Sequence, residues 1–143
     1  MSATDFFHGV TVTNVDTGAR PIALPSSSII GLCDTFDVGG EATAKPNDLR
    51  LITRESEAVA AWGEGAPITN ACKAIFARAK AVIVACGVAK VADPAQQTSA
   101  IIGGVLADGT RTGLQALLDG KSRFNAQPRL LIAPKHSATQ AVG

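Results

Sequence analysis

The feature that most restricts the fold of this chain is a nearly all-apolar run at residues 81–86, Ala-Val-Ile-Val-Ala-Cys. A strand of this composition has no polar face, so it is expected where helices cover both faces of a sheet. Three more apolar runs predict strands at residues 28–33, 49–52 and 129–133, the last of them also buried. Because helical signals separate these strands, we predict an α/β fold, a sheet with helices on its faces.

The helices are predicted from capping residues and from the spacing of apolar side chains. Thr53 is expected to cap the first helix, and the second has an apolar face formed by residues 72, 75, 76 and 79. Asp93, followed by Pro94, begins the third. The predicted ranges are 53–62, 68–79, 93–106 and 112–120.

The first 25 residues differ from the rest and are predicted to form an extended N-terminal β arm. Residues 9–15 alternate apolar and polar side chains, which indicates a strand with one buried face. Residues 16–18 form a turn, and Pro21 and Pro25 exclude a helix after it. A two-stranded ribbon alone is marginally stable in water. The arm therefore needs a sheet to join, either in its own chain or in another.

The last residues carry a helix signal that is not followed by a helix. Residues 137–140 form a capping box, and Ala141 and Val142 begin an apolar face. A helix of about one turn is not stable alone. We therefore expect residues 26–143 to be an incomplete portion of a larger α/β domain. The alternative is a frayed natural terminus.

The net charge is +1, but the two halves of the chain differ in sign. Residues 1–70 contain nine acidic and four basic side chains, a net charge of −5, whereas residues 71–143 contain three acidic and nine basic ones, a net charge of +6. Such halves could attract head to tail in a polymer, or could be differing solvated faces. No basic excess with interleaved aromatic residues is present, so nucleic-acid binding is not predicted.

No residues are arranged in a pattern that predicts catalysis, a metal site or a cofactor. Residues 120–122, Gly-Lys-Ser, resemble the end of a phosphate-binding loop, but Gln115 stands where that loop needs glycine. Cys33, Cys72 and Cys86 lie in apolar runs, which indicates small buried side chains in a reducing compartment. Cys72 or Cys86 with His136 leaves a remote alternative, a small α/β cysteine enzyme. We predict that the chain is not an enzyme.

Neither targeting nor membrane insertion is predicted. The N-terminus, Met-Ser-Ala-Thr-Asp, lacks the basic start and apolar stretch of a signal peptide. No apolar run approaches the length of a membrane span. We therefore expect a soluble protein that is made in the cytoplasm.

Three long stretches resemble contractile tail sheath proteins. Residues 6–15, Phe-Phe-His-Gly-Val-Thr-Val-Thr-Asn-Val, look like the opening of that family, and residues 22–34 continue the match. Residues 111–134 are very similar to the sheath of R-type pyocins, the phage-tail-like bacteriocins of Pseudomonas, and of related phages. The resemblance spans all 143 residues as a long, ordered run.

The resemblance implies a structural subunit of a contractile tail, in a virion or a phage-tail-like particle assembled in the bacterial cytoplasm. Such subunits stack as rings around a tail tube above a baseplate, and contraction drives the tube through the target cell envelope. Terminal arms pass strands to neighbouring subunits. On this chain the strand-exchange residues would be those of the alternating arm, within residues 1–25: Val10, Thr11, Val12, Thr13, Asn14 and Val15.

One further alternative is a truncated sheath-like piece that binds sheath, baseplate or an assembly partner. The family pattern includes a C-terminal part with its own arm and a tube-facing region, and these 143 residues do not contain it.

Overall fold

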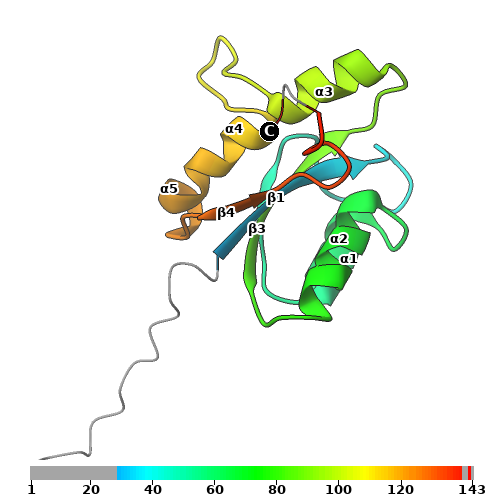
Figure 1. The fold of residues 1–143 in the computed structure, drawn as a ribbon, viewed down its shortest axis with the longest axis vertical. Helices are drawn as coiled ribbons and strands as arrows, with labels where there is room; N and C mark the ends of the chain where they lie inside the picture. The colour runs from blue at the N-terminus through cyan, green and yellow to red at the C-terminus, as the bar shows by residue number, and fades with distance from the viewer. Residues whose placement is uncertain (1–28, 140–141, 143) are drawn as a thin grey trace, which may run out of the picture.

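A computed structural model describes residues 29–139 and residue 142 of the chain. Within this part a four-stranded sheet is flanked by helices (Figure 1). The predicted α/β class is confirmed. The elements in chain order are β1 (Ile29–Phe36), β2 (Leu49–Ile52), α1 (Glu55–Trp62), α2 (Pro67–Phe76), β3 (Val82–Ala89), α3 (Pro94–Ile102), α4 (Gly113–Ala116), the 3₁₀ turn η2 (Leu117–Asp119), α5 (Gly120–Phe124) and β4 (Leu130–Ile132).

The strand order in the sheet is β2-β3-β1-β4. Strands β3 and β4 both run parallel to β1, and β2 runs antiparallel to β3. Parallel neighbours require crossover connections, and helices provide them here. The chain passes through α1 and α2 between β1 and β3, and through α3, α4 and α5 between β3 and β4. Figure 1 shows these two helical layers on opposite faces of the sheet.

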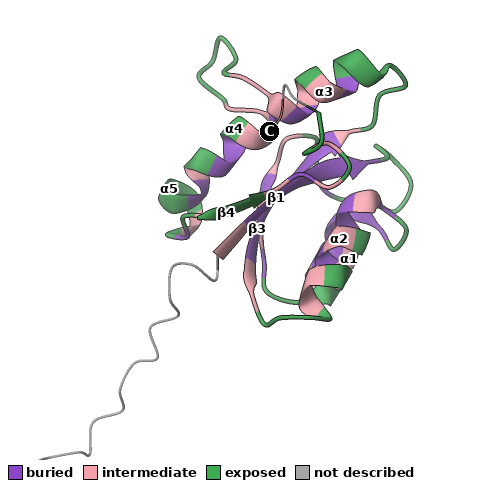
Figure 2. Ribbon diagram, viewed as in Figure 1, coloured by how far each residue is buried: buried purple, intermediate pink, exposed green. Residues whose placement is uncertain are grey.

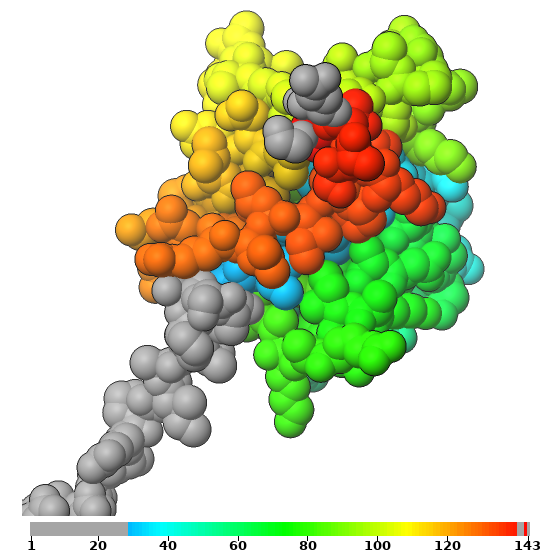
Figure 3. Space-filling view, viewed as in Figure 1, coloured from blue at the N-terminus to red at the C-terminus, as the bar shows by residue number. Residues whose placement is uncertain are grey.

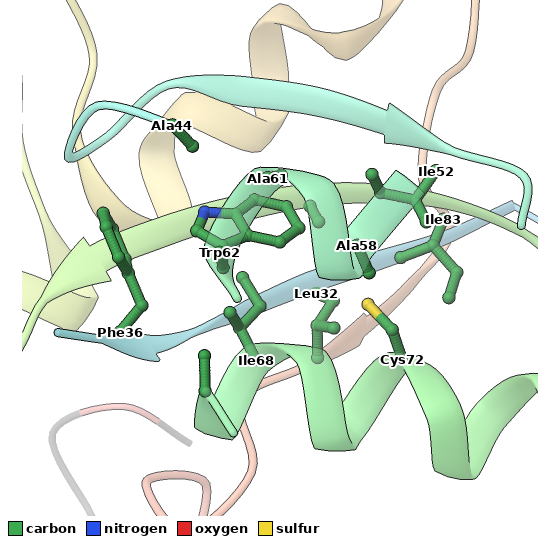
Figure 4. Close-up of a cluster of buried hydrophobic side chains, with 12 residues drawn as sticks. Leu32, Phe36, Ala44, Ile52, Ala58, Ala61, Trp62, Ile68, Cys72 and Ile83 are labelled. Atoms are coloured by element: carbon green, nitrogen blue, oxygen red, sulfur yellow. The ribbon is translucent and has the colours of Figure 1, made fainter. Parts of the chain in front are cut away.

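Each face of the sheet has its own apolar core, because side chains alternate along β1 and β3. On the α1/α2 face, Leu32 and Phe36 of β1 and Ile83 of β3 pack with Trp62 and Ile68 (Figure 4). The opposite face, beneath α3 to α5, is a second cluster: Cys33, Leu49, Val84, Cys86, Val88, Ile101, Ala116, Leu117, Ala126 and Ala133. This arrangement agrees with the prediction that the run at 81–86 is covered on both faces.

The two central strands continue for three residues beyond their predicted ends. The prediction ended the first strand at Cys33, because Asp34 and Thr35 are polar. In the structure, β1 runs to Phe36, and the register Asp34–Gly87, Thr35–Val88 and Phe36–Ala89 keeps it paired with β3. Ladder hydrogen bonds to a partner strand thus outweigh the polarity of two side chains.

Helix α1 ends as predicted but begins differently. Trp62 is its last residue, and Gly63 follows with φ of 88°. The N-cap is Arg54, not Thr53. The Glu57 carboxylate accepts the backbone N–H groups of Thr53 at 2.7 Å and of Arg54 at 3.3 Å. These bonds, led by the one from Thr53, lower the pKa of Glu57.

The second and third helices are both shorter than predicted. Helix α2 ends at Phe76, and Ala79, predicted on its apolar face, is exposed. Helix α3 ends at Ile102 because Gly103 has φ of 71°, a backbone conformation that favours glycine. A β-carbon there would lie 1.9 Å from the carbonyl oxygen of Thr112. Val105 and Leu106, predicted on this helix, are 63% and 54% exposed on a hairpin at residues 103–112.

The helical run that begins at Gly113 does not end at Gly120 as predicted. It continues through η2 and α5 to Phe124, and Asn125 closes it with φ of 53°. Gly120 is buried inside the run, where a β-carbon would approach the carbonyl oxygen of Ala126 to 2.7 Å. Leu118, predicted as buried, is 64% exposed. At the predicted final helix, residues 137–139 form turns.

Candidate functional site

The predicted strand-exchange residues lie outside the described part of the chain. Val10, Thr11, Val12, Thr13, Asn14 and Val15 all precede residue 29, where the description begins. Their pairing thus remains a prediction, and the surfaces described below belong to the α/β part.

Strand β4 is an exposed edge of the sheet. The prediction placed a buried strand here, and this is wrong: Leu130 and Leu131 are 52% and 59% exposed. Figure 2 shows β4 as exposed, in contrast to the buried central strands. Among the described residues β4 pairs with β1 alone. Its other edge offers backbone N–H and C=O groups to a further strand.

An apolar hollow of about 250 Å³ lies beside this edge strand. The segment that carries β4, orange in Figure 3, runs across the surface of the molecule in that view. Exposed apolar strands that border such hollows are typical of contact surfaces. The hollow is lined by Leu114, Leu131, Ile132, Ala133, Ser137 and Val142.

A larger hollow of about 550 Å³, here called the basic hollow, lies between the loop before β2, the 103–112 hairpin and α5. Three cations, Lys45, Arg50 and Arg123, line it together with one acid, Asp48. Asp48 lies 3.2 Å from Arg50 and 3.9 Å from Arg123, measured between charged atoms. Three cations and one carboxylate leave the hollow with an excess of positive charge. The other lining residues are Thr43, Pro46, Asn47, Leu106, Thr110 and Thr112.

Asn47 holds the two sides of the basic hollow together. It has φ of 62°, a conformation that asparagine tolerates better than most residues. Its backbone N–H donates to the carbonyl oxygen of Gly87 at 2.7 Å. Its side-chain oxygen accepts the N–H of Gly113 at 3.1 Å, at the start of α4. One residue thereby joins the loop before β2 to the sheet and to the helical layer that carries Arg123.

A loop of opposite charge follows β1. Residues 37–41, Asp-Val-Gly-Gly-Glu, are all exposed and are here called the acidic loop. Val38 at its tip is 62% exposed. The loop borders a hollow of about 200 Å³ that Glu64 also lines. Lys90 lies 3.8 Å from Asp37, and Lys73 pairs with Glu64 and Glu55. Four acids and two lysines leave this region with negative charge.

The cysteines are buried as predicted. Cys33, Cys72 and Cys86 are fully buried and free. Burial raises the pKa of Cys72 to about 12, and the hydrogen bond with the neighbouring Cys86, together with burial, raises the pKa of Cys33. Because the thiolate is the reactive form, these pKa values disfavour a nucleophilic role for Cys33 and Cys72.

Other chemical sites receive no support from the geometry. Residues 120–122 lie inside a helical run, whereas a phosphate-binding loop joins a strand to a helix. In residues 29–139, no group of three or more His, Cys, Asp or Glu side chains is placed to hold a metal ion. No described helix is long and apolar enough to span a bilayer.

Asp34 is a buried acid that the sequence patterns did not single out. It lies within β1, is 2% exposed, and accepts the backbone N–H of Thr35 at 2.7 Å. Burial raises its pKa, and the hydrogen bond from the backbone N–H of Thr35, followed by the charges of His136 and Lys135, partly opposes this effect. The one sequence signal is an acidic residue directly after an apolar run.

The hollows and the exposed edge were missed because they depend on segments far apart in the chain. Lys45 and Arg123 line one hollow although more than half of the chain separates them. The charge asymmetry between the two halves did not indicate these surfaces, because the acidic loop and two of the three hollow cations, Lys45 and Arg50, all lie in residues 1–70.

Comparison with known proteins identifies relatives of one kind. The chain is 67% identical over 137 residues to a prophage major tail sheath protein of Pseudomonas aeruginosa strain UCBPP-PA14, covering 96% of this chain and 36% of that protein. It is 32% identical over 139 residues to the tail sheath protein of Escherichia phage P2, covering 91% of this chain and 34% of that protein. The major tail sheath protein of Serratia phage KSP20 is 32% identical over 143 residues, with 95% and 35% covered.

The predicted resemblance to tail sheath proteins is confirmed by these relatives. No protein-family model matches the chain. The chain spans about a third of the length of the curated relatives it matches, between 34% and 36%. It therefore aligns with one part of those tail sheath proteins.

Proposed function

We propose that this chain, a relative of tail sheath proteins, contributes to a structural subunit that polymerises around a tail tube and contracts. Contraction would drive the tube through the envelope of a target cell. The observation that carries the proposal is the identity of 67% to a prophage tail sheath protein over 96% of this chain. The partners would be neighbouring sheath subunits, the tube and the baseplate, in a tail assembled in the bacterial cytoplasm.

The proposed division of labour assigns residues 1–25 to a strand-exchange arm and residues 26–143 to an α/β domain. Val10, Thr11, Val12, Thr13, Asn14 and Val15 would add as a strand to a sheet of an adjacent copy. Backbone hydrogen bonds would supply the joint, and Val10 and Val12, on one face, would set its register. The support for this role is the alternating pattern of residues 9–15, which needs a sheet to join.

Contraction would use energy stored in the arrangement of subunits. Each subunit would gain a little contact free energy when the lattice shortens, and many subunits acting together would add those gains. The arms would keep neighbours joined while the α/β domains move. This mechanism requires no nucleotide.

The first experiment is to purify tail particles from cells that express this chain and to analyse them by mass spectrometry. Peptides unique to this chain are expected at the abundance of a major sheath component. Particles that contain sheath but lack these peptides would contradict the proposal. The intact mass also tests a second candidate, a sheath-like piece that binds sheath, baseplate or an assembly partner. That candidate predicts a species of 143 residues at low copy number.

The second experiment tests the arm. Val12→Pro removes one backbone donor and should reduce the number of intact sheaths seen by electron microscopy, because a ladder hydrogen bond is lost. Val12→Ile keeps the donor and the β-branched side chain and serves as the matched control. Deletion of residues 1–20 should abolish assembly. Normal sheaths with the deletion would refute the role of the arm.

A further inference from the structure

The basic hollow combines an excess of positive charge with an apolar side chain on its lining. Its volume of about 550 Å³ lies in the size range of ligand pockets. Lys45 and Arg123 are exposed on its lining, and Arg50 is half-buried. Leu106, 54% exposed, adds an apolar contact beside the cations. An occupant should therefore carry carboxylates and one short apolar side chain.

The acidic loop has this composition. Asp37 and Glu41 bracket Val38 and two glycines, and every residue of the loop is exposed. Gly39 and Gly40 have φ of 104° and 65°, and nothing lies within 4 Å of a β-carbon at either position. The loop is thus slender and free of bulky neighbours at its tip. Its charge is opposite to that of the basic hollow, and Val38 supplies the apolar side chain that would contact Leu106.

The acidic loop directly precedes residues 43–50, which form one side of the basic hollow, but the other two sides, the 103–112 hairpin and α5, come from distant segments of the chain. In Figure 1 the acidic loop follows the arrowhead of β1, whereas the 103–112 hairpin and α5 lie on the other side of the view. A loop on one copy that fits a hollow elsewhere on the next copy makes a heterologous contact, which repeats from copy to copy.

We propose that the basic hollow receives the acidic loop of a second copy of this chain in a head-to-tail contact. The inference deepens the proposed assembly function, because it names a contact between α/β domains that is independent of the arm. Exposed ion pairs are weak and are screened by salt. The contact is therefore transient between free copies. In an assembly that holds many copies in a row, the local concentration of partners is high and the contact forms repeatedly.

Cysteine cross-linking tests this contact on the chain in solution. Val38→Cys in one population and Thr110→Cys in another place thiols at the loop tip and on the hollow. The native cysteines are fully buried and do not compete. Disulfide formation in the mixture should be about fivefold faster than in a control mixture of Ala79→Cys with Thr110→Cys, the factor for a contact of about 1 kcal/mol. Equal rates in the two mixtures would overturn the proposal.

Charge exchange tests whether the two opposite charges recognise each other. Glu41→Arg in the Val38→Cys population should slow cross-linking to the control rate, and Arg123→Glu in the Thr110→Cys population should restore it. High salt should remove the advantage of the original pair. If Arg123→Glu does not restore the cross-linking rate lost with Glu41→Arg, or if the cross-linking rates do not depend on salt, the contact is contradicted. Circular dichroism of each variant confirms that it is folded.

The outcomes separate this inference from the proposed function. Cross-linking reports on the contact without any particle, whereas mass spectrometry reports on membership of the tail. Specific cross-linking by a chain absent from particles would sustain the contact and refute the sheath role. Presence of the chain in particles without specific cross-linking would support the sheath role and refute the contact.

Discussion

Strands β3 and β4 both run parallel to β1 and are both largely apolar, yet one lies at the centre of the sheet and the other at its edge. Ile83, Val84, Ala85 and Cys86 of β3 are fully buried. On β4, Leu130 and Leu131 are more than half exposed. Strand β3 has a partner strand on each side and a helical layer on each face. Among the described residues β4 has one partner strand.

The contrast shows that an apolar run indicates a strand but not its place in the sheet. Burial of a strand depends on its neighbours on both edges and both faces, and those are supplied by distant segments. Four predictions use mutations to test the contrast between the closed centre and the open edge, from the largest expected effect to the smallest.

The largest effect is expected for truncation of a side chain at the centre. Ile83→Ala should lower the free energy of unfolding by about 2–5 kcal/mol, since it leaves a cavity among packed side chains. Leu131→Ala, the matched change on β4, should cost less than about 1 kcal/mol, because the leucine is 59% exposed. Urea denaturation measures both. Similar losses at the two positions would mean that β4 is not an open edge.

Added side-chain volume should also be tolerated better near the edge. Gly87→Ala on β3 places a β-carbon 2.4 Å from Nε1 of the buried Trp62 and should cost about 1–3 kcal/mol. A β-carbon in Gly31→Ala on β1 meets Cδ2 of the half-exposed Leu131 at 2.7 Å, which can move, and lies 3.0 Å from Leu117 and Pro128. We therefore expect a smaller loss for Gly31→Ala. Thermal unfolding of the two variants compares them, and a larger loss for Gly31→Ala would contradict the contrast.

Asp34 lies on β1, between the central strand β3 and the edge strand β4, and it predicts how the stability of the protein depends on pH. Burial raises its pKa in the folded state, so the folded protein holds this proton more tightly than the unfolded chain does. Stability from this group is therefore greatest below the unfolded pKa and falls as the pH rises through the folded pKa. Asp34→Asn should abolish this fall and raise stability at neutral pH by on the order of 1 kcal/mol.

Denaturant titrations at several pH values measure the effect of Asp34→Asn. The difference between the variant and the original protein should grow with pH and then level off. A difference that shrinks as the pH rises would mean that the hydrogen bond from Thr35 and the charges of His136 and Lys135 stabilise the carboxylate by more than burial destabilises it.

The smallest effect on stability is expected at the open edge itself. Leu131→Lys should change the free energy of unfolding by about 0.5 kcal/mol or less, because the side chain is largely in solvent. It should nevertheless lower concentration-dependent light scattering, since a charge on an edge strand opposes pairing with other chains. Leu118→Lys, at a leucine 64% exposed on the helical run, is the control. Equal reductions for both variants would show that edge pairing is not the cause.

Local patterns predicted the centre of the fold well. The strand at 49–52 and the helix starts at Pro94 and Gly113 agree with the structure. Strand composition and the Asp93 cap, whose side chain accepts the N–H of Ala95, act over a few neighbours, whereas Thr112 makes no such cap bond. Helix ends were less predictable. The positive φ of Gly103 ends α3 early, and Gly120, a plausible end signal, is instead buried within a helical run.

The candidate contact surfaces were not predictable as surfaces. The charges of the acidic loop and the basic hollow were visible in the sequence, but their grouping was not. Arg123 reaches the hollow only because α5 packs beside the hairpin and the loop before β2. The orientation of these segments depends on the packing of both helical layers on one sheet.

The sequence by itself determined the α/β class, the burial of the cysteines and the similarity to tail sheath proteins. Each of these rests on local periodicity, on residue type or on direct identity along the chain. Tertiary structure alone decided which apolar strand is enclosed and which is open, and where opposite charges gather. Those properties arise from neighbours that are distant in the chain, so no local pattern contains them.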